Sequence, residues 1–168
     1  MSKAFTREET EGHDLPEVVR PASALPPGTI NYMTADGAER LRAELARLIE
    51  IERPRFVAAR NAESKQKLTQ TDQRIYQLEQ SLQSARVVSH AKGPAPSVTF
   101  GASVTIEGPE GREKFTIVGV DETDLESGRI SWLSPVARAL MNSRVGERIL
   151  FKYPCGEEQV GVISITYE

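Results

Sequence analysis

Few residues of this chain are of types that do chemistry, and the most suggestive ones stand at a predicted turn between two apolar repeats. The turn contains Asn61, Glu63, Ser64 and Lys65, and Glu63 is its only carboxylate. A hard cation such as Mg²⁺ prefers several oxygen ligands, and neighbouring lysines would compete with it. Glu63 is therefore only a weak candidate for a catalytic or metal-binding role, and we expect it to lie in a solvated turn.

Other potential metal ligands are too few to form a site. Asp121, Glu122, Asp124 and Glu126 form an acidic loop, which is typical of a solvated turn. The chain has one cysteine, Cys155, and two histidines, so the sequence predicts neither a disulfide nor a metal site. It also predicts no catalytic residue and no cofactor of its own.

The spacing of apolar residues divides the chain into segments. Residues 1–30 are polar and proline-rich, and we expect a disordered or extended tail there. Residues 31–90 repeat at helical spacing, and Pro54 predicts a kink or a restart of the first helix. The second helix has an apolar seam with the heptad spacing of a coiled coil. The seam residues are Leu68, Thr71, Ile75, Leu78, Leu82 and Ala85.

The C-terminal segment follows a different pattern. Residues 91–97 contain glycine and prolines and indicate a linker, and residues 98–168 alternate apolar and polar residues as strands do. One short helix interrupts this pattern: Ser134 suits its N-cap, and Pro135 suits its first position. The sequence thus predicts an α+β protein, a helical hairpin joined to an antiparallel sheet with one short helix.

Composition excludes several classes of protein. Residues 1–30 hold three basic and five acidic residues. Residues 31–92 hold eleven basic and eight acidic residues, and residues 93–168 hold seven basic and eleven acidic residues. This asymmetry permits contact with nucleic acid or an acidic protein surface but falls short of a basic DNA-binding domain. No apolar run approaches the roughly 20 residues that cross a bilayer. We expect a cytoplasmic protein without membrane contact, since a single cysteine also fits a reducing compartment.

Several short motifs follow one another along residues 32–168. They are Tyr32–Leu45, Glu52–Pro54, Asp72–Ile75, Ala85–Val88, Phe100–Thr105, Ile117–Glu122, the strand–helix junction Ile130–Leu140, Val145–Glu147 and Ile165–Tyr167. In this order and spacing they resemble the Gre family of bacterial transcription elongation factors. Within that resemblance, Tyr32–Leu45 opens the family's first helix, and Ala85–Val88 ends its second.

The resemblance implies a fold and a partner. The fold is an antiparallel coiled-coil hairpin over residues 31–90 joined to an FKBP-like domain over residues 98–168. In the family, the C-terminal domain docks on RNA polymerase beside the secondary channel, and the coiled coil projects down that channel. Acidic residues at the tip help hold a Mg²⁺ ion at the polymerase active centre, where backtracked RNA is hydrolysed. The polymerase-binding loop then consists of Leu133, Ser134, Pro135 and Arg138.

The sequence departs from the family at the tip. The interval between Glu52–Pro54 and Asp72–Ile75 is about fourteen residues shorter than the family pattern, which removes ~10 Å of helix from each arm. The acidic tip motif is absent, and Leu133 occupies a position that is commonly acidic in the family. Mg²⁺ would matter only as the polymerase's own ion, if the tip reached it.

Our leading hypothesis is a Gre-type accessory factor, not itself an enzyme, that binds RNA polymerase and regulates elongation with weak or no stimulation of transcript cleavage. We expect a monomer, with indirect contact to nucleic acid in the transcription complex. The alternatives are an active cleavage factor that uses Glu63, an FKBP-like prolyl isomerase, and a plain coiled-coil interaction module that dimerises.

Overall fold

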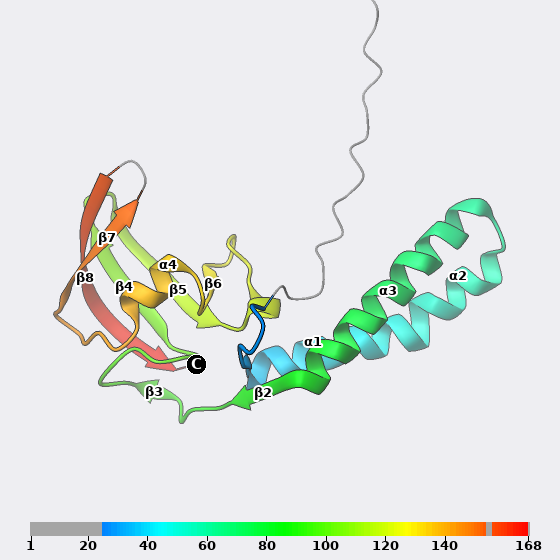
Figure 1. The fold of residues 1–168 in the computed structure, drawn as a ribbon, viewed down its shortest axis with the longest axis horizontal. Helices are drawn as coiled ribbons and strands as arrows, with labels where there is room; N and C mark the ends of the chain where they lie inside the picture. Colours follow the sequence, from blue (N-terminus) through cyan, green and yellow to red (C-terminus); the bar gives the residue numbers. More distant parts are fainter. Residues whose placement is uncertain (1–24, 154–155, 168) are drawn as a thin grey trace, which may run out of the picture.

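An elongated helical arm projects from a β-sheet part (Figure 1). The computed structural model describes residues 25–153 and 156–167. Most of the predicted tail, residues 1–24, and Cys155 lie outside the described residues. The protein is a mixed helix-and-sheet structure, whereas the coiled-coil and FKBP-like classifications stay predictions. No helix within the described ranges combines the length and the apolar character needed to cross a membrane.

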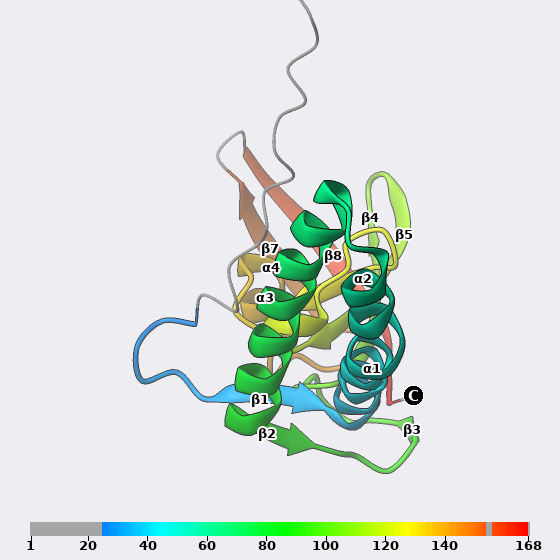
Figure 2. The same ribbon diagram turned by 90° about the vertical axis from the view of Figure 1, so that its right-hand side faces the viewer.

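The arm consists of two helical stretches that pack side by side (Figures 1 and 2). The outgoing stretch comprises α1 (Ala35–Arg47), the π-helical turn η1 (Leu48–Glu52) and α2 (Arg53–Ala59), and α3 (Ala62–Ser84) returns beside it. Leu41, Leu48 and Leu78 are buried between the two stretches, and Ile75 and Leu82 pack against them. Full burial of one such leucine stabilises the arm by about 1.5–3 kcal/mol.

The outgoing stretch is interrupted near Pro54, as predicted. Proline has no N–H to donate to the carbonyl four residues earlier, so a regular helix cannot continue through it. The chain widens into η1 and restarts as α2, with Pro54 in the first turn, where no such bond is needed. Arg53 Nε then lies 2.8 Å from Asp72 Oδ1 of α3, and this exposed ion pair links the two stretches.

The base of the arm is a two-stranded parallel sheet, which we had not expected within the hairpin over residues 31–90. Strand β1 (Asn31–Thr34) pairs with β2 (Ala85–Val88) (Figure 2). The prediction that the second helix continues through Ala85–Val88 was wrong, whereas Thr34 is the N-cap of the first helix, as its residue type indicates. Thr34 caps α1 from an extended conformation, so the helix begins only at Ala35. The β-branched residues of β2 suit a strand, and Ala85 itself is already extended.

The C-terminal part is built on a six-stranded sheet. Its strands are β3 (Gly93–Pro94), β4 (Ser103–Gly108), β5 (Gly111–Val118), β6 (Arg129–Ser131), β7 (Arg148–Tyr153) and β8 (Gly156–Tyr167). They lie in the order β3-β8-β4-β5-β6, and β7 pairs with β8. Helix α4 (Pro135–Leu140) packs on the sheet, where Ala137 and Leu140 join the apolar core.

Two features of this sheet differ from the prediction. The sheet is not wholly antiparallel, because β6 runs parallel to β5. After β5 the chain passes through the 3₁₀ turn η2 (Val120–Glu122). It then returns to the sheet, and residues 129–131 of β6 pair with residues 116–118 of β5. The predicted linker at residues 91–97 contains β3, which pairs with the end of β8. Pro94 is tolerated there because β3 is an edge strand.

Candidate functional site: the β6–α4 loop, the tip of the arm and the joint

The β6–α4 loop contains the residues expected to bind RNA polymerase. The Ser134 hydroxyl oxygen accepts a hydrogen bond from the backbone N–H of Ala137 at 3.1 Å, which confirms the predicted N-cap. Pro135 and Arg138 are exposed, whereas Leu133 and Ser134 are half-buried. The loop therefore presents a rigid proline and a guanidinium to solvent. The Ser134 hydroxyl still has its proton to donate to a partner.

The tip of the arm is a tighter turn than predicted. Helix α2 ends at Ala59, Arg60 adopts a left-handed conformation with φ of 50°, and Asn61 caps α3. The Asn61 side-chain oxygen accepts from the backbone N–H of Ser64 at 2.7 Å. The predicted turn over Asn61–Lys65 was wrong in extent, because this cap starts α3 at once. Glu63, Ser64 and Lys65 belong to the first helical turn, and Ser64 is buried.

Glu63 is exposed and engaged with a lysine. Lys67 Nζ lies 2.6 Å from Glu63 Oε1, one helical turn away. This hydrogen bond, together with the charge of Lys67, lowers the pKa of Glu63 below its ordinary value. Arg60 and Lys65 are exposed nearby in the sequence and are also cationic. Across the described ranges, no group of three or more His, Cys, Asp or Glu side chains is arranged so that it could hold a metal ion. One carboxylate tied to a lysine does not fit a shared Mg²⁺ ion.

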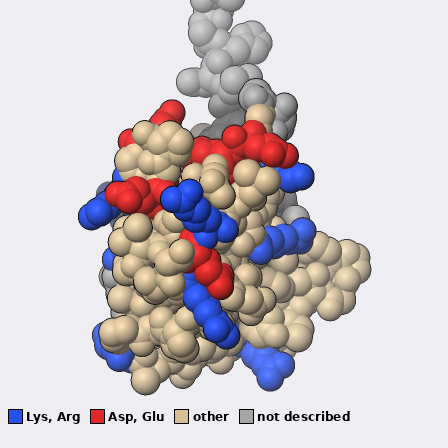
Figure 3. Space-filling view, turned by 90° about the vertical axis from the view of Figure 1, so that its left-hand side faces the viewer, with Lys and Arg blue, Asp and Glu red and all other residues tan. Residues whose placement is uncertain are grey.

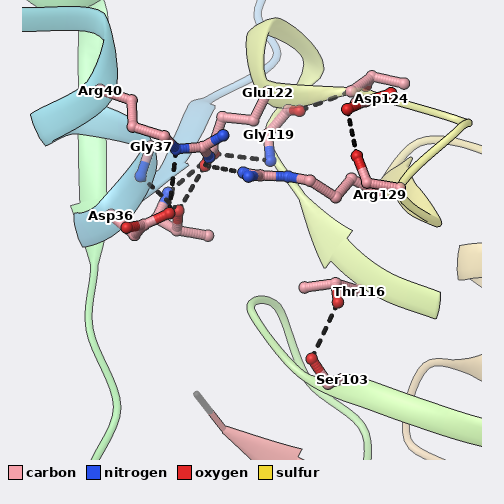
Figure 4. A network of polar contacts seen from close by, with 12 residues as sticks. Asp36, Gly37, Arg40, Ser103, Thr116, Gly119, Glu122, Asp124 and Arg129 are labelled. Atoms are coloured by element: carbon pink, nitrogen blue, oxygen red, sulfur yellow. Dashed lines mark hydrogen bonds and ion pairs between the residues drawn. The ribbon is translucent and has the colours of Figure 1, made fainter. Parts of the chain in front are cut away.

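The most elaborate polar arrangement was not predicted, and it lies where the arm meets the sheet (Figure 4). The Glu122 side chain is 1% exposed, so its expected place in a solvated turn was wrong. Its Oε2 accepts from the backbone N–H groups of Thr34 at 2.9 Å and of Gly119 at 3.0 Å. Its Oε1 accepts from the Thr34 hydroxyl and lies 3.4 Å from Arg129 Nη2 and 3.8 Å from Arg40 Nη2. We call these five residues and Gly37 the joint.

Two glycines leave the space that Glu122 occupies. A Cβ atom on Gly37 would lie 1.7 Å from Glu122 Oε1, and one on Gly119 would lie 2.3 Å from the backbone carbonyl oxygen of Tyr32. Neither position admits a side chain without movement of the carboxylate or of β1. Glycine is unusual as the third residue of a helix. Gly37 is therefore the feature of the sequence from which this joint could have been suspected.

Further contacts attach the arm to the sheet. The ring of Tyr32, on β1, packs 5.3 Å from Trp132 edge to face and 5.6 Å from Phe100, measured between ring centroids. On the other side, the Ser81 hydroxyl of α3 donates to the carboxylate of Asp121. Because β1 and α3 are both tied to the loop after β5, the direction of the arm relative to the sheet is set at the joint.

The outer end of the acidic loop is exposed, as predicted, whereas Asp121 is half-buried. Asp124 and Glu126 both face solvent. Asp124 accepts from the Ser127 hydroxyl and, at 3.2 Å, from the backbone N–H of Glu126. The bond from Ser127 is the main cause that lowers the pKa of Asp124. These contacts organise a turn and leave only Glu122 of the four carboxylates in a buried, multiply bonded position.

Comparison with known proteins identifies the family. The family model "Transcription elongation factor, GreA/GreB, C-term" matches residues 93–167. The transcription elongation factor GreB of Neisseria meningitidis serogroup B is 35% identical over 155 residues, which cover 83% of this chain and 95% of the relative. The chain belongs to the GreA/GreB family. It is a Gre-type transcription elongation factor, as the motifs had indicated.

Other members of the GreA/GreB family align over a similar extent. The transcription elongation factor GreA of Thermodesulfovibrio yellowstonii is 36% identical over 152 residues, which cover 81% of this chain and 96% of the relative. A solved structure described as "Prokaryotic transcription elongation factor GreA/GreB from Nitrosomonas europaea" is 25% identical. It covers 81% of this chain and 98% of its own, with a TM-score of 0.40.

Proposed function

We propose that this Gre factor binds RNA polymerase beside the secondary channel through the β6–α4 loop, and that it regulates elongation with little or no stimulation of transcript cleavage. The observation that carries the proposal is the state of the tip. Its carboxylate, Glu63, is bound to Lys67 and stands beside further cations. A tip of this kind occupies a channel but contributes no ligand pair for a metal ion.

The exposed side of α4 supports the docking part of the proposal. Pro135 and Arg138 face solvent, while Ala137 and Leu140 on the other face are completely buried. The helix is thereby held rigidly against the sheet, and its outer residues need no rearrangement to meet a partner. A rigid, pre-organised surface binds with a smaller loss of conformational entropy.

The length of the arm supports the absence of strong cleavage. Helix α3 has 23 residues, which corresponds to ~34 Å. The arm is ~10 Å shorter than the family pattern at 1.5 Å per residue. Catalysis requires reacting groups to be placed within a fraction of that distance. The factor would therefore act by occupying the channel, as an accessory protein and not as an enzyme.

Several finer assignments belong to the same proposal. We infer that the arm is a coiled coil, that the C-terminal part is FKBP-like, and that the protein acts as a cytoplasmic monomer. Contact with nucleic acid would be indirect, through the transcription complex. The seam between the two stretches of the arm is filled within one chain, which supports a monomer over a coiled-coil module that dimerises.

The test combines binding and cleavage. Purified protein is mixed with core RNA polymerase of its own organism, and stalled, backtracked complexes are then incubated with Mg²⁺. We expect binding, no RNA cleavage above the level of polymerase alone, and competition with a family member that has an acidic tip. Arg138→Glu should weaken binding, whereas Arg144→Glu, an equal charge change at another exposed position, should not. Lack of binding by the unaltered protein would refute the proposal, and efficient cleavage lost in Glu63→Ala would favour an active cleavage factor.

A further inference from the structure

A small cavity opens on the C-terminal sheet next to α4. Its volume is about 190 Å³, below the roughly 300–1,000 Å³ typical of sites for drug-sized molecules. The cavity is therefore of a size for part of a molecule, such as one long side chain. Its apolar lining consists of Ile106, Phe115, Val136, Phe151 and Val160.

Three carboxylates line the same cavity, and no basic residue does. They are Glu110, Glu113 and Glu158. The register of the sheet pairs Glu113 with Ile106, and Glu158 with Phe151. Directly paired residues point to the same face of a sheet. Glu113 and Glu158 therefore lie on the face that carries the buried Ile106 and Phe151, where Glu158 is half-buried and Glu113 is exposed at the rim of the cavity.

Two basic residues near these carboxylates in sequence are engaged with other glutamates. Arg112 Nε lies 2.9 Å from Glu107, and Lys152 Nζ lies 3.4 Å from Glu157. Within the described residues, the three carboxylates of the cavity have no cationic partner. Figure 3, which views the end of the molecule opposite the arm, shows carboxylates gathered over the upper part of this face with lysine and arginine side chains among them.

Gly108 leaves space for one carboxylate of the cavity. A Cβ atom on Gly108 would lie 2.6 Å from Glu158 Oε1 and 3.2 Å from Val160 Cγ1. The Glu158 side chain therefore lies directly over the glycine, at the rim of the cavity. The arrangement combines an apolar floor with negative charge at the rim, and both parts are fixed by the strands that carry them.

This combination is complementary to a long basic side chain. Lysine and arginine bury an apolar stem while their charged head stays at a polar boundary. Arginine can also bond a carboxylate with two parallel N–H groups, and such pairs are among the stronger hydrogen bonds in proteins. A neutral or acidic side chain would leave the three carboxylates without a partner.

The cavity is continuous with the expected docking surface. Val136 lines it and directly follows Pro135 of the β6–α4 loop. We propose that this cavity receives a lysine or arginine side chain of RNA polymerase when the β6–α4 loop docks, an inference that rests on the proposed function.

The test removes two of the three charges of the cavity without changing its shape. In Glu113→Gln/Glu158→Gln, affinity for core RNA polymerase is measured at low and at moderate salt. We expect binding to weaken about tenfold at low salt, mainly through faster dissociation, because the basic side chain loses its partners. The matched control is Glu126→Gln/Glu157→Gln, which changes the net charge equally at exposed positions outside the cavity and should bind like the unaltered protein.

The outcomes separate this inference from the proposed function. If the unaltered protein binds polymerase and the cavity variant binds as tightly as its control, the cavity does not receive a basic side chain, while the proposed function stands. If the unaltered protein does not bind at all, the proposed function fails, and this inference fails with it. Urea denaturation of both variants verifies that they are folded.

Discussion

Neutralising Glu122 should loosen the attachment of the arm to the sheet. In Glu122→Gln the side chain keeps its shape and loses its charge. Both backbone donors, from Thr34 and Gly119, still find an oxygen at 2.9 Å and 3.0 Å. The other oxygen becomes an NH₂ group, which faces the guanidinium of Arg129 and the Thr34 hydroxyl. The hydroxyl can turn to accept from the NH₂ group, whereas the attraction to Arg129 is replaced by a contact between two donors.

The magnitude follows from these contacts. A hydrogen bond to a charged acceptor contributes about 1.5–3 kcal/mol and a neutral one about 0.5–1.5 kcal/mol, so each backbone donor loses roughly 1 kcal/mol. Arg129, with its side chain 18% exposed, is left without its carboxylate, which costs roughly another 1 kcal/mol, less than for a fully buried pair. Arg40 is half exposed and contributes little. We expect the free energy of unfolding to fall by about 3 kcal/mol in total.

The assay is urea denaturation followed by tryptophan fluorescence. The only tryptophan, Trp132, packs against Tyr32 of β1 and so reports on the joint itself. With a slope of about 2 kcal/mol per molar urea, a loss of 3 kcal/mol lowers the midpoint by roughly 1.5 M. Glu126→Gln is the matched control, because it removes the same charge from an exposed position of the same loop.

One result would refute this reasoning. A change in the free energy of unfolding below roughly 0.5 kcal/mol, the range of ordinary surface substitutions, would mean that the Glu122 contacts do not stabilise the joint. The double variant Glu122→Gln/Arg129→Met separates the two contributions. Because it removes the unpaired guanidinium as well, it should be more stable than the sum of the single changes predicts.

Two further predictions follow from the joint and the tip. Gly37→Ala should lower the free energy of unfolding by about 2 kcal/mol, because the new Cβ displaces Glu122. We expect this loss although alanine in a helix is ordinarily more favourable than glycine by up to about 1 kcal/mol. Stabilisation in the same urea assay would contradict the packing described. At the tip, Lys67→Met should raise the pKa of Glu63 toward its ordinary value, measured by carbon NMR. Since the pKa of Glu63 is lower in the folded state, the pair stabilises α3 fully at pH values above the pKa that Glu63 has in the unfolded chain. This stabilisation is lost as the pH falls through the pKa of the folded state. A Glu63 pKa that is unchanged by the substitution would show that the pair does not form.

Local structure was predictable wherever neighbouring residues decide it. Thr34 and Ser134 cap their helices, and Pro54 interrupts the first stretch, because a side chain and a backbone group a few residues apart suffice for each effect. The period of the apolar residues likewise placed the buried leucines of the arm. The order of short motifs placed the chain in its family, since that order is a property of the sequence alone.

The joint and the cavity depend on tertiary structure. Thr34 and Glu122 are 88 residues apart in the sequence, and no local rule tells a buried carboxylate from the exposed ones beside it at Asp124 and Glu126. Strands β1 and β2 pair with each other, and β1 is bonded through Thr34 to Glu122 of the loop after β5. Glu113 and Glu158 meet in one cavity only through the register of their strands with Ile106 and Phe151. Sequence determined the family and the local elements; the long-range pairing of strands decided which charges are buried and which remain available to a partner.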